Sequence, residues 1–321
     1  MKIAVVGAGA FGTALAISLA AAGREVLLWG RDTARVDAMR RAGENAAYVP
    51  GVPLPKGITL TSEFADLAET ETVLLSIPTQ RLGKLAGAHS DILNGKTLVA
   101  CCKGIDLTQL VGPTTILKAS CPESTVAVLT GPSFAADIAR GLPTALTLAC
   151  TDEHAGVALQ KSLTTPNLRL YRPTDTLGAE LGGALKNVMA IACGAVMGAR
   201  LGESARAALM TRGYAEMKRM AEALGARHET LSGLSGFGDL TLTCTSDQSR
   251  NYRFGLSLGR SEPFDPTVTV EGAATAKAAS ALAQKHNIDM PITNAVAALA
   301  SGQVSVQDVL KALLSRPLKE E

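Results

Sequence analysis

Three glycines near the start of the chain have the spacing of a phosphate-binding turn. Gly7, Gly9 and Gly12 form the pattern G-x-G-x-x-G between an apolar segment, residues 2–6, and an Ala/Leu-rich segment, residues 13–22. In a strand–turn–helix unit the first glycine permits a tight turn, the second lets the backbone approach a pyrophosphate, and the third lets the helix pack on the strand. The N–H groups of the helix N-terminus attract the phosphates. The pattern predicts a dinucleotide site.

The same opening segment is open to a second interpretation. Lys2 followed by an uncharged, mostly apolar run as far as Gly23 resembles a secretory signal peptide. The three early glycines would weaken the helix of such a signal. A strand followed by a helix that Gly23 closes fits the residue pattern better.

Arg31 and Asp32 follow the second strand-like segment, residues 25–30, and could select the cofactor. Arg31 stands where a protein meets the 2′-phosphate of NADP, and an acidic residue in this region holds the 2′-hydroxyl of NAD. We therefore expect both cofactors to be used, with NADP(H) preferred. A solvated surface charge is the alternative for Arg31.

Lys186 is the strongest candidate for acid–base chemistry. Gly182, Gly183, Ala190 and Cys193 share its face of a predicted helix. Each glycine costs a helix about 1 kcal/mol relative to alanine, so a glycine pair indicates that something approaches the helix closely. Burial on such a face lowers the pKa of a lysine, which can then act as a general base near neutral pH. A snorkelling lysine beside packing glycines is the alternative.

Two further candidates follow predicted strands. Lys103 leaves the strand-like segment 97–102, and ligands of doubly wound sheets bind beyond the carboxyl ends of strands. Gly131 and Pro132 are predicted to start a helix, so that Ser133 and nearby N–H groups form a second anion-accepting terminus. A surface lysine and ordinary helix punctuation are the respective alternatives.

The helical half of the sequence adds a carboxylate and a polar cluster. Asp239 lies in a glycine-rich turn, where it could cap a helix or orient an ammonium group such as that of Lys186. Ser249, Arg250 and Asn251 begin the next helical segment. A guanidinium, a hydroxyl, an amide and helix N–H groups together suit a phosphate, although a plain surface helix would have the same composition.

The elements that must position these residues fall into two predicted domains. Residues 1–174 alternate apolar strands with helices, which predicts a Rossmann-type parallel sheet covered on both faces. Residues 175–321 show helical periods alone, which predicts an all-α domain. The predicted strands are 2–6, 25–30, 72–77, 97–102, 125–130, 144–150 and 168–172. The predicted helices are 13–22, 32–42, 79–87, 106–118, 132–140, 152–162, 176–199, 203–224, 235–243, 246–259, 271–286, 291–301 and 304–315.

Composition narrows the class of protein further. Aromatic residues make up 3% of the 321 residues and the net charge is +2, so nucleic acid is not an expected partner. The later apolar run 188–199 is broken by glycine and too short to span a bilayer. Six cysteines without C-x-x-C spacing indicate reduced, buried thiols in a cytoplasmic protein, and the scattered histidines predict no metal site.

Taken together, these segments resemble bacterial NAD(P)-dependent glycerol-3-phosphate dehydrogenase along essentially the whole chain. The resemblance rests on Gly-Ala-Gly-Ala-Phe-Gly, Asn45-Ala-Ala-Tyr48-Val-Pro, Cys-Lys103-Gly, Gly131-Pro-Ser-Phe-Ala, Gly-Gly-Ala-Leu-Lys186-Asn-Val, Gly-Phe-Gly-Asp239-Leu, Leu-Thr-Cys-Thr, Gln-Ser249-Arg250-Asn251, Val270-Glu271-Gly and Met290-Pro-Ile. It implies interconversion of sn-glycerol 3-phosphate and dihydroxyacetone phosphate, which supplies phospholipid synthesis.

The resemblance also implies roles for individual residues. Lys186 is the implied proton acceptor, with Lys103 and Asp239 as further catalytic residues. The implied substrate-binding residues are Lys103, Gly131, Ser133, Lys186, Asp239, Ser249, Arg250 and Asn251. The implied cofactor-binding residues are Gly7, Gly9, Ala10, Phe11, Gly12, Arg31, Lys103, Ala135, Arg250 and Glu271.

The sequence differs from the family pattern at two places, and two other functions remain as alternatives. Position 10 is often serine in the family and is Ala10 here, which removes one side-chain hydrogen bond to phosphate. Residues 259–269 are short relative to some members, which affects the path to Glu271. The alternatives are another two-domain dehydrogenase, of a hydroxy acid or sugar phosphate, and a dinucleotide-sensing regulator without turnover. The sequence leaves the oligomeric state open, a homodimer included.

Overall fold

The computed structural model describes residues 2–315 and divides them into two compact units. Unit 1 comprises residues 2–103 and 111–180, and unit 2 comprises residues 104–110 and 181–315. The sequence predicted a domain boundary between residues 174 and 175. The two units divide six residues later, between Glu180 and Leu181, inside a long helix, and unit 2 also takes the segment 104–110.

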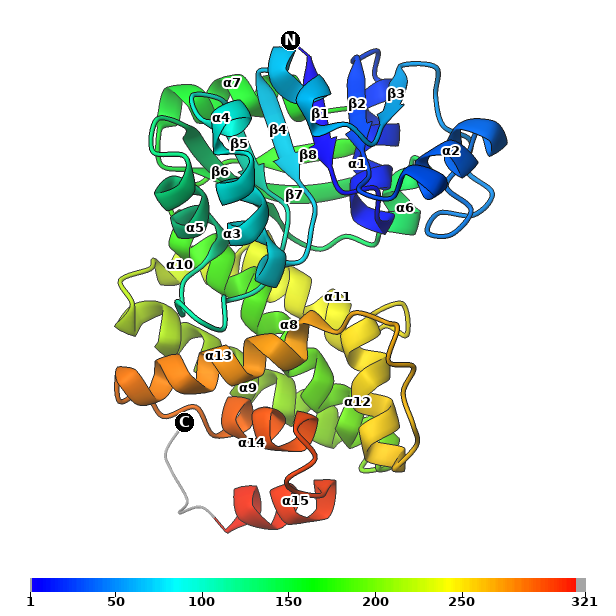
Figure 1. Ribbon diagram of the computed structural model, residues 1–321. Coiled ribbons are helices and arrows are strands. Elements are labelled where there is room, and N and C mark those ends of the chain that lie inside the picture. The colour runs from blue at the N-terminus through cyan, green and yellow to red at the C-terminus, as the bar shows by residue number, and fades with distance from the viewer. Residues whose placement is uncertain (1, 316–321) are drawn as a thin grey trace. The chain divides into compact units, whose positions relative to one another are not determined.

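Unit 1 is built on one eight-stranded sheet (Figure 1). Its strands are β1 (Ile3–Val6), β2 (Val26–Trp29), β3 (Ile58–Thr61), β4 (Thr72–Leu75), β5 (Thr97–Ala100), β6 (Thr125–Thr130), β7 (Thr144–Cys150) and β8 (Leu168–Tyr171), and their order is β3-β2-β1-β4-β5-β6-β7-β8. Neighbouring strands are parallel except β6 and β7, which are antiparallel. The Rossmann-type fold with its predominantly parallel sheet is confirmed; the antiparallel pairing of β6 with β7 and the strand β3 were not predicted.

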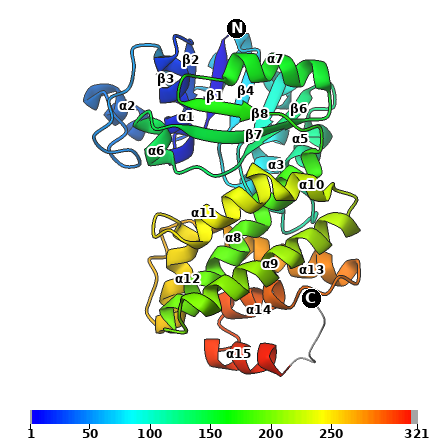
Figure 2. The same ribbon diagram turned by 180° about the vertical axis from the view of Figure 1, so that it is seen from behind.

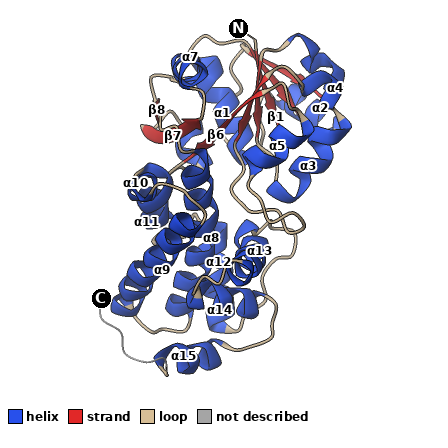
Figure 3. Ribbon diagram, turned by 90° about the vertical axis from the view of Figure 1, so that its left-hand side faces the viewer, coloured by secondary structure: helices blue, strands red, loops and turns tan. Residues whose placement is uncertain are grey.

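Helices cover both faces of this sheet (Figure 3). They are α1 (Ala10–Ala21), α2 (Thr33–Ala42), the 3-10 helix η1 (Phe64–Glu69), α3 (Thr79–Ala88), α4 (Ser90–Leu93), α5 (Pro113–Ser120), α6 (Ala135–Ala139) and α7 (Glu153–Leu163). Alternate strand residues enter different cores, as a period of two requires. Val5 packs with Leu15 of α1, whereas the next residue, Val6, packs with Leu82 of α3.

Unit 2 is helical throughout its described residues, and α8 runs through its middle (Figures 1 and 2). Its helices are α8 (Thr176–Gly198), whose first turn belongs to unit 1, α9 (Glu203–Ala223), α10 (His228–Ser232), the π-helical turn η2 (Leu234–Gly238), α11 (Asp239–Cys244), α12 (Arg250–Arg260), α13 (Glu271–Lys285), α14 (Pro291–Ala300) and α15 (Val306–Leu314). The all-α prediction for this half is confirmed.

Helix α8 is the one described helix whose length and composition would suit a membrane span. It has 23 residues, so it is longer than the apolar run 188–199 on which the sequence argument depended. In the structure 89% of its most apolar 18-residue window is buried inside the protein. Such burial is typical of a core helix.

Candidate active site

The β1–α1 turn has the packing that its three glycines predict. Gly7 has a φ of +112°, and a Cβ atom there would overlap the carbonyl oxygen of Ser76. A Cβ atom on Gly12 would overlap the carbonyl oxygen of Gly7, so the helix can approach the strand only because this residue is glycine. No atom lies within 4 Å of the Cβ position at Gly9. The turn therefore presents bare backbone to open space, which fits a pyrophosphate.

The N-terminus of α1 leaves its first N–H groups available to an anion. Gly9 is the N-cap residue and supplies no side-chain cap. Ala10 and Phe11 begin the helix, and Phe11 is half-buried against the core. Because the side chain of Ala10 cannot donate a hydrogen bond, backbone N–H groups alone can serve a phosphate here.

Arg31 and Asp32, the two residues that could select between NADP and NAD, follow β2 and have different environments. Arg31 is exposed. Asp32 is the N-cap of α2, and its Oδ1 accepts a hydrogen bond from the backbone N–H of Arg35 at 3.1 Å. Asp32 is exposed as well, but one of its carboxylate oxygens stabilises a helix terminus.

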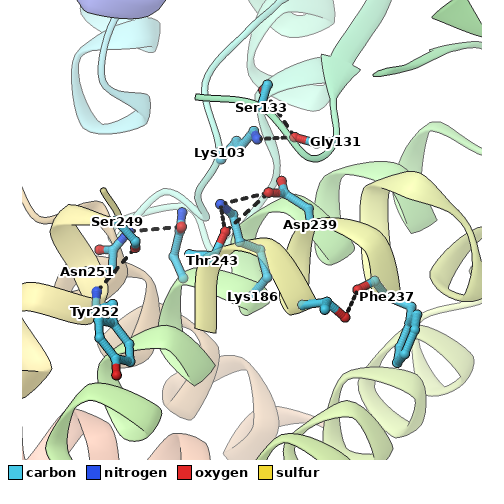
Figure 4. A network of polar contacts seen from close by, with 12 residues as sticks. Lys103, Gly131, Ser133, Lys186, Phe237, Asp239, Thr243, Ser249, Asn251 and Tyr252 are labelled. Carbon is cyan, nitrogen blue, oxygen red and sulfur yellow. Dashed lines mark hydrogen bonds and ion pairs between the residues drawn. The ribbon is translucent and has the colours of Figure 1, made fainter. Parts of the chain in front are cut away.

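Lys103, Gly131 and Ser133 lie together in unit 1 (Figure 4). The ammonium of Lys103 donates to the carbonyl oxygen of Gly131 at 2.9 Å, and the hydroxyl of Ser133 donates to the same oxygen at 3.2 Å. The predicted helix start at Gly131 was wrong, because α6 begins at Ala135 and has only five residues. Gly131 instead has a φ of +130° and ends β6 in a turn.

Lys186, Asp239 and Thr243 form a closed triangle of polar contacts in unit 2 (Figure 4). The ammonium of Lys186 lies 3.0 Å from Oδ1 of Asp239 and donates to the hydroxyl of Thr243 at 2.7 Å. That hydroxyl in turn donates to Oδ1 of Asp239 at 3.2 Å. The exposed fractions of the three residues are 7%, 0% and 2%. The sequence argument linked Asp239 to Lys186 but missed Thr243, which lies one helical turn after Asp239.

A glycine in α8 explains why the triangle can form. Gly182 lies one turn before Lys186, and a Cβ atom on it would be 2.5 Å from the carbonyl oxygen of Ser235. The η2 turn therefore packs directly on the backbone of α8. Asp239 follows this turn at once, so the close approach brings its carboxylate to Lys186. The close approach that the glycine pair predicted is confirmed at Gly182.

Within the triangle, Lys186 and Asp239 form a buried ion pair. A buried charge without a partner is strongly unfavourable, and Asp239 supplies the partner. Cys244 lies beside the pair, and its own burial together with the neighbouring Cys193 raises the pKa of its thiol well above the usual range. The thiol therefore stays protonated, and no thiolate competes with Asp239 for Lys186.

A second polar network adjoins the first on α8. The side-chain amide of Asn251 donates to Oδ1 of Asn187 at 2.9 Å, and Oδ1 of Asn251 accepts from the backbone N–H of Gly272 at 3.0 Å. Asn251 therefore joins α12 to α8 and to the N-terminus of α13, where Glu271 is the first, half-buried residue. Asn187 was not predicted, although it follows Lys186 directly.

The other members of the predicted phosphate cluster lie at the start of α12. Ser249 is the N-cap, and its Oγ accepts from the backbone N–H of Tyr252 at 3.2 Å (Figure 4). Arg250 follows and is exposed. The hydroxyl of Ser249 and the amide of Asn251 thus have structural partners, whereas the guanidinium of Arg250 is the exposed cation of the cluster.

Glycines also allow α12 to cross α8 in direct backbone contact. Cβ atoms on Gly194 and Gly255 would overlap the carbonyl oxygens of Tyr252 and Ile191 respectively, each on the opposite helix. This crossing begins one turn beyond Lys186 and brings the N-terminal end of α12 next to Asn187. The positions of Ser249, Arg250 and Asn251 therefore follow from helix packing.

Two features of the described residues bear on metal and redox chemistry. In the part of the chain that the structure describes, no three His, Cys, Asp or Glu residues are placed to hold a metal ion. The cysteines Cys101, Cys102, Cys121, Cys150, Cys193 and Cys244 are all buried and free, as predicted.

A dinucleotide turn on a Rossmann-type sheet and a buried lysine–carboxylate pair in a helical unit define a two-unit, NAD(P)-dependent dehydrogenase. Residues 2–156 match the model of the NAD-dependent glycerol-3-phosphate dehydrogenase N-terminus, and residues 175–311 match that of the C-terminus. The chain belongs to the NAD-dependent glycerol-3-phosphate dehydrogenase family, which confirms the resemblance inferred from the sequence.

Individual relatives agree with this assignment over their full length. The chain is 60% identical to a glycerol-3-phosphate dehydrogenase (NAD(P)+) of Ruegeria sp. (strain TM1040) and 59% identical to one of Paracoccus denitrificans (strain Pd 1222), covering 100% of each chain. A crystal structure of glycerol-3-phosphate dehydrogenase from Coxiella burnetii is similar with a TM-score of 0.93 and 35% identity, covering 98% of this chain and 99% of that one.

Proposed function

We propose that this protein interconverts dihydroxyacetone phosphate and sn-glycerol 3-phosphate with NADP(H) or NAD(H), and that Lys186 handles the proton. The observation that carries the proposal is the buried triangle of Lys186, Asp239 and Thr243. An ammonium held by a carboxylate and a hydroxyl has a fixed position, which a general acid or base needs.

Each member of the triangle has a distinct task in the proposed reaction. The residues of the β1–α1 turn would hold the nicotinamide dinucleotide, which when bound would supply the exchange of hydride with C2 of the substrate. In reduction the ammonium of Lys186 delivers a proton to the carbonyl oxygen and becomes a neutral amine. In oxidation that neutral amine takes the proton of the C2 hydroxyl and becomes the ammonium again. Asp239 and Thr243 orient this nitrogen, and its charge stabilises negative charge that develops on the substrate oxygen.

We assign substrate binding to residues in both units. The exposed guanidinium of Arg250, at the N-terminus of α12, suits the substrate phosphate. A phosphate ligand in turn favours a phosphorylated triose over a plain hydroxy acid. The remaining proposed substrate-binding residues are Lys103, Gly131, Ser133, Ser249 and Asn251.

We assign cofactor binding to the β1–α1 turn and to neighbouring residues. The bare backbone at Gly9 and the exposed side chain of Arg31 support this assignment. The proposed set is Gly7, Gly9, Ala10, Phe11, Gly12, Arg31, Lys103, Ala135, Arg250 and Glu271. We further propose that residues 1–174 form the cofactor-binding domain and residues 175–321 the substrate domain, without a membrane span or a nucleic-acid partner. We place the reaction in the cytoplasm, supplying glycerol 3-phosphate for phospholipid synthesis.

The proposal is tested by following NADPH absorbance with dihydroxyacetone phosphate as the single added substrate. Turnover supports the proposed reaction. Oxidation of NADPH by a keto acid or by another sugar phosphate, and not by dihydroxyacetone phosphate, would indicate a different dehydrogenase. NADPH binding without turnover on any of them would indicate a regulator.

The role of Lys186 has its own test. Lys186→Met is expected to lower kcat by about 10²–10⁴-fold and to leave the Kd for NADPH nearly unchanged, which is the usual share of a general base. Lys285→Met, at an exposed lysine of the same unit, is the matched control and should behave as the wild type. Turnover by Lys186→Met within a few fold of wild type at every pH would exclude Lys186 as the proton acceptor.

A further inference from the structure

The segment Asn45–Pro50 carries part of the family resemblance but has no role in the site described above. It follows α2, and Asn45 is only 1% exposed. The side-chain amide nitrogen of Asn45 donates two hydrogen bonds, to the carbonyl oxygen of Ala8 at 3.0 Å and to the hydroxyl of Thr13 at 2.8 Å. Ala8 lies between the first two glycines of the dinucleotide turn, and Thr13 lies in the first turn of α1.

We propose that Asn45 is a positioning residue for the cofactor, because its amide fixes the turn that presents backbone N–H groups to the pyrophosphate. This inference rests on the proposed cofactor site and adds to it a residue that does not itself contact the dinucleotide. Three observations support it: the chemistry of the two acceptors, the separate anchoring of the segment, and the open space beside Gly9.

The acceptor chemistry fixes the orientation of the amide. A carbonyl oxygen can only accept a hydrogen bond, so the NH₂ group of Asn45, and not its oxygen, must face Ala8. Aspartate has nearly the same size but has only acceptors when ionised, and it would place oxygen against oxygen. Leucine matches the size without charge and offers no donor. The two substitutions therefore remove the same hydrogen bonds by different means.

The segment is held in place without the side chain of Asn45. The backbone carbonyl of Asn45 accepts hydrogen bonds from the N–H groups of Tyr48 and Val49, which close a turn. Val49 is buried in a cluster with Ala14 and Ile17 of α1. Substitution of Asn45 should therefore leave the segment folded against α1 and alter chiefly the support of the glycine turn.

The backbone of the glycine turn has conformational freedom that the hydrogen bonds of Asn45 can restrict. Gly9 has no atom within 4 Å of its Cβ position, so no side chain packs on that side. Glycine also has more backbone freedom than any other residue. Two hydrogen bonds that bracket Gly9, one to the residue before it and one to the first turn of the helix, restrict that freedom before the cofactor binds. Such preorganisation increases affinity without a new contact to the ligand.

The test is a fluorescence titration with NADPH, which requires no turnover. Asn45→Leu and Asn45→Asp should each raise the Kd for NADPH roughly 10- to 100-fold, the range expected when buried hydrogen-bond acceptors lose their donor. At saturating NADPH, kcat and the KM for dihydroxyacetone phosphate should stay within about twofold, because the triangle of Lys186 lies in the other unit. Thr13→Val should give a smaller loss, and it should add nothing when combined with Asn45→Leu.

Val49→Ala is the matched control, since it removes buried contacts of the same segment and does not touch the amide. It should lower the melting temperature and leave the Kd for NADPH unchanged. If Val49→Ala weakens NADPH binding as much as Asn45→Leu, or if Asn45→Leu binds NADPH as tightly as wild type, Asn45 is not a positioning residue. An effect of Asn45→Asp alone would point to charge repulsion and overturn the proposal as well. Failure of the wild type to bind NADPH would contradict the proposed cofactor instead.

Discussion

The carboxyl group of Glu180 should make the stability of unit 1 depend on pH. Glu180 is 6% exposed, and its Oε1 accepts a hydrogen bond from the backbone N–H of Thr114 at 2.5 Å. Its other oxygen packs against Gly112, where a Cβ atom would overlap it. The carboxyl thus occupies the N-terminus of α5. Burial raises the pKa of Glu180 from 4.5 to about 7, although the hydrogen bonds from Thr114 oppose the increase.

The direction of the effect follows from which state binds the proton more tightly. Between pH 4.5 and about 7 the folded protein holds a proton on Glu180 that the unfolded chain has already released. Rising pH therefore lowers the free energy of unfolding across this window, and the loss is complete above it. Each pH unit corresponds to about 1.4 kcal/mol, so the total is roughly 3 kcal/mol.

Glu180→Gln isolates this contribution, because an amide keeps the shape of the protonated acid and does not titrate. Free energies of unfolding should be measured with urea at about pH 5, 6, 7 and 8 for both proteins. The stability of Glu180→Gln relative to wild type should rise by roughly 2.5 kcal/mol over this range, because part of the difference is already lost at pH 5. Thr115→Ala, at an exposed position of α5 that does not titrate, should show a constant difference. A constant difference for Glu180→Gln as well would refute the reasoning.

Three further substitutions test other parts of the structure. Arg31→Ala should raise the KM for NADPH about 5- to 30-fold more than that for NADH, since the ligands differ only in the 2′-phosphate; an unchanged ratio of kcat/KM values would make Arg31 a solvated surface charge. Arg250→Ala should raise the KM for dihydroxyacetone phosphate by the equivalent of about 1.5–3 kcal/mol and can weaken NADPH too; undiminished preference over dihydroxyacetone would assign the phosphate to another group. Glu216→Ala should lower the free energy of unfolding by about 3 kcal/mol, because its buried carboxylate accepts from the N–H groups of Ile292 and Thr293. Glu216→Gln should cost less, and equal losses in urea melts would contradict this account.

Apart from residues 168–172, whose apolar and charged side chains alternate, the strands that the sequence predicted have continuous apolar runs. Such runs are buried on both faces, which is the condition that makes them visible in a sequence. β3 was missed because it has no continuous apolar run. Its four residues alternate threonine with aliphatic side chains, and only the last one, Thr61, is buried. The antiparallel direction of β7 was missed because an apolar run indicates burial but not direction.

The start of helix α5 was predicted at the wrong residue. A helix was expected from residue 106, yet α5 begins at Pro113. Asp106 instead accepts hydrogen bonds from the N–H groups of Thr108 and Gln109, and Leu110 has a φ of +57°. These features form a turn. Proline at the first helical position was the stronger start signal in the sequence, because its fixed φ suits that position.

In the candidate site, too, some features could be predicted from the sequence and others depend on tertiary packing. Gly182 costs its helix stability, so the sequence alone indicated that another part of the chain must lie against it. The identity of that part could not follow from spacing, because Ser235 is more than fifty residues away and its contact depends on the path of two intervening helices, α9 and α10. Thr243 was missed for a related reason: a threonine inside a helix has no distinctive pattern until Asp239 is known to face Lys186. Once that pair is placed, the residue one turn beyond Asp239 must face the same ammonium. Residue chemistry therefore predicted the lysine and its carboxylate, and the third member of the triangle follows from the helix that carries the carboxylate.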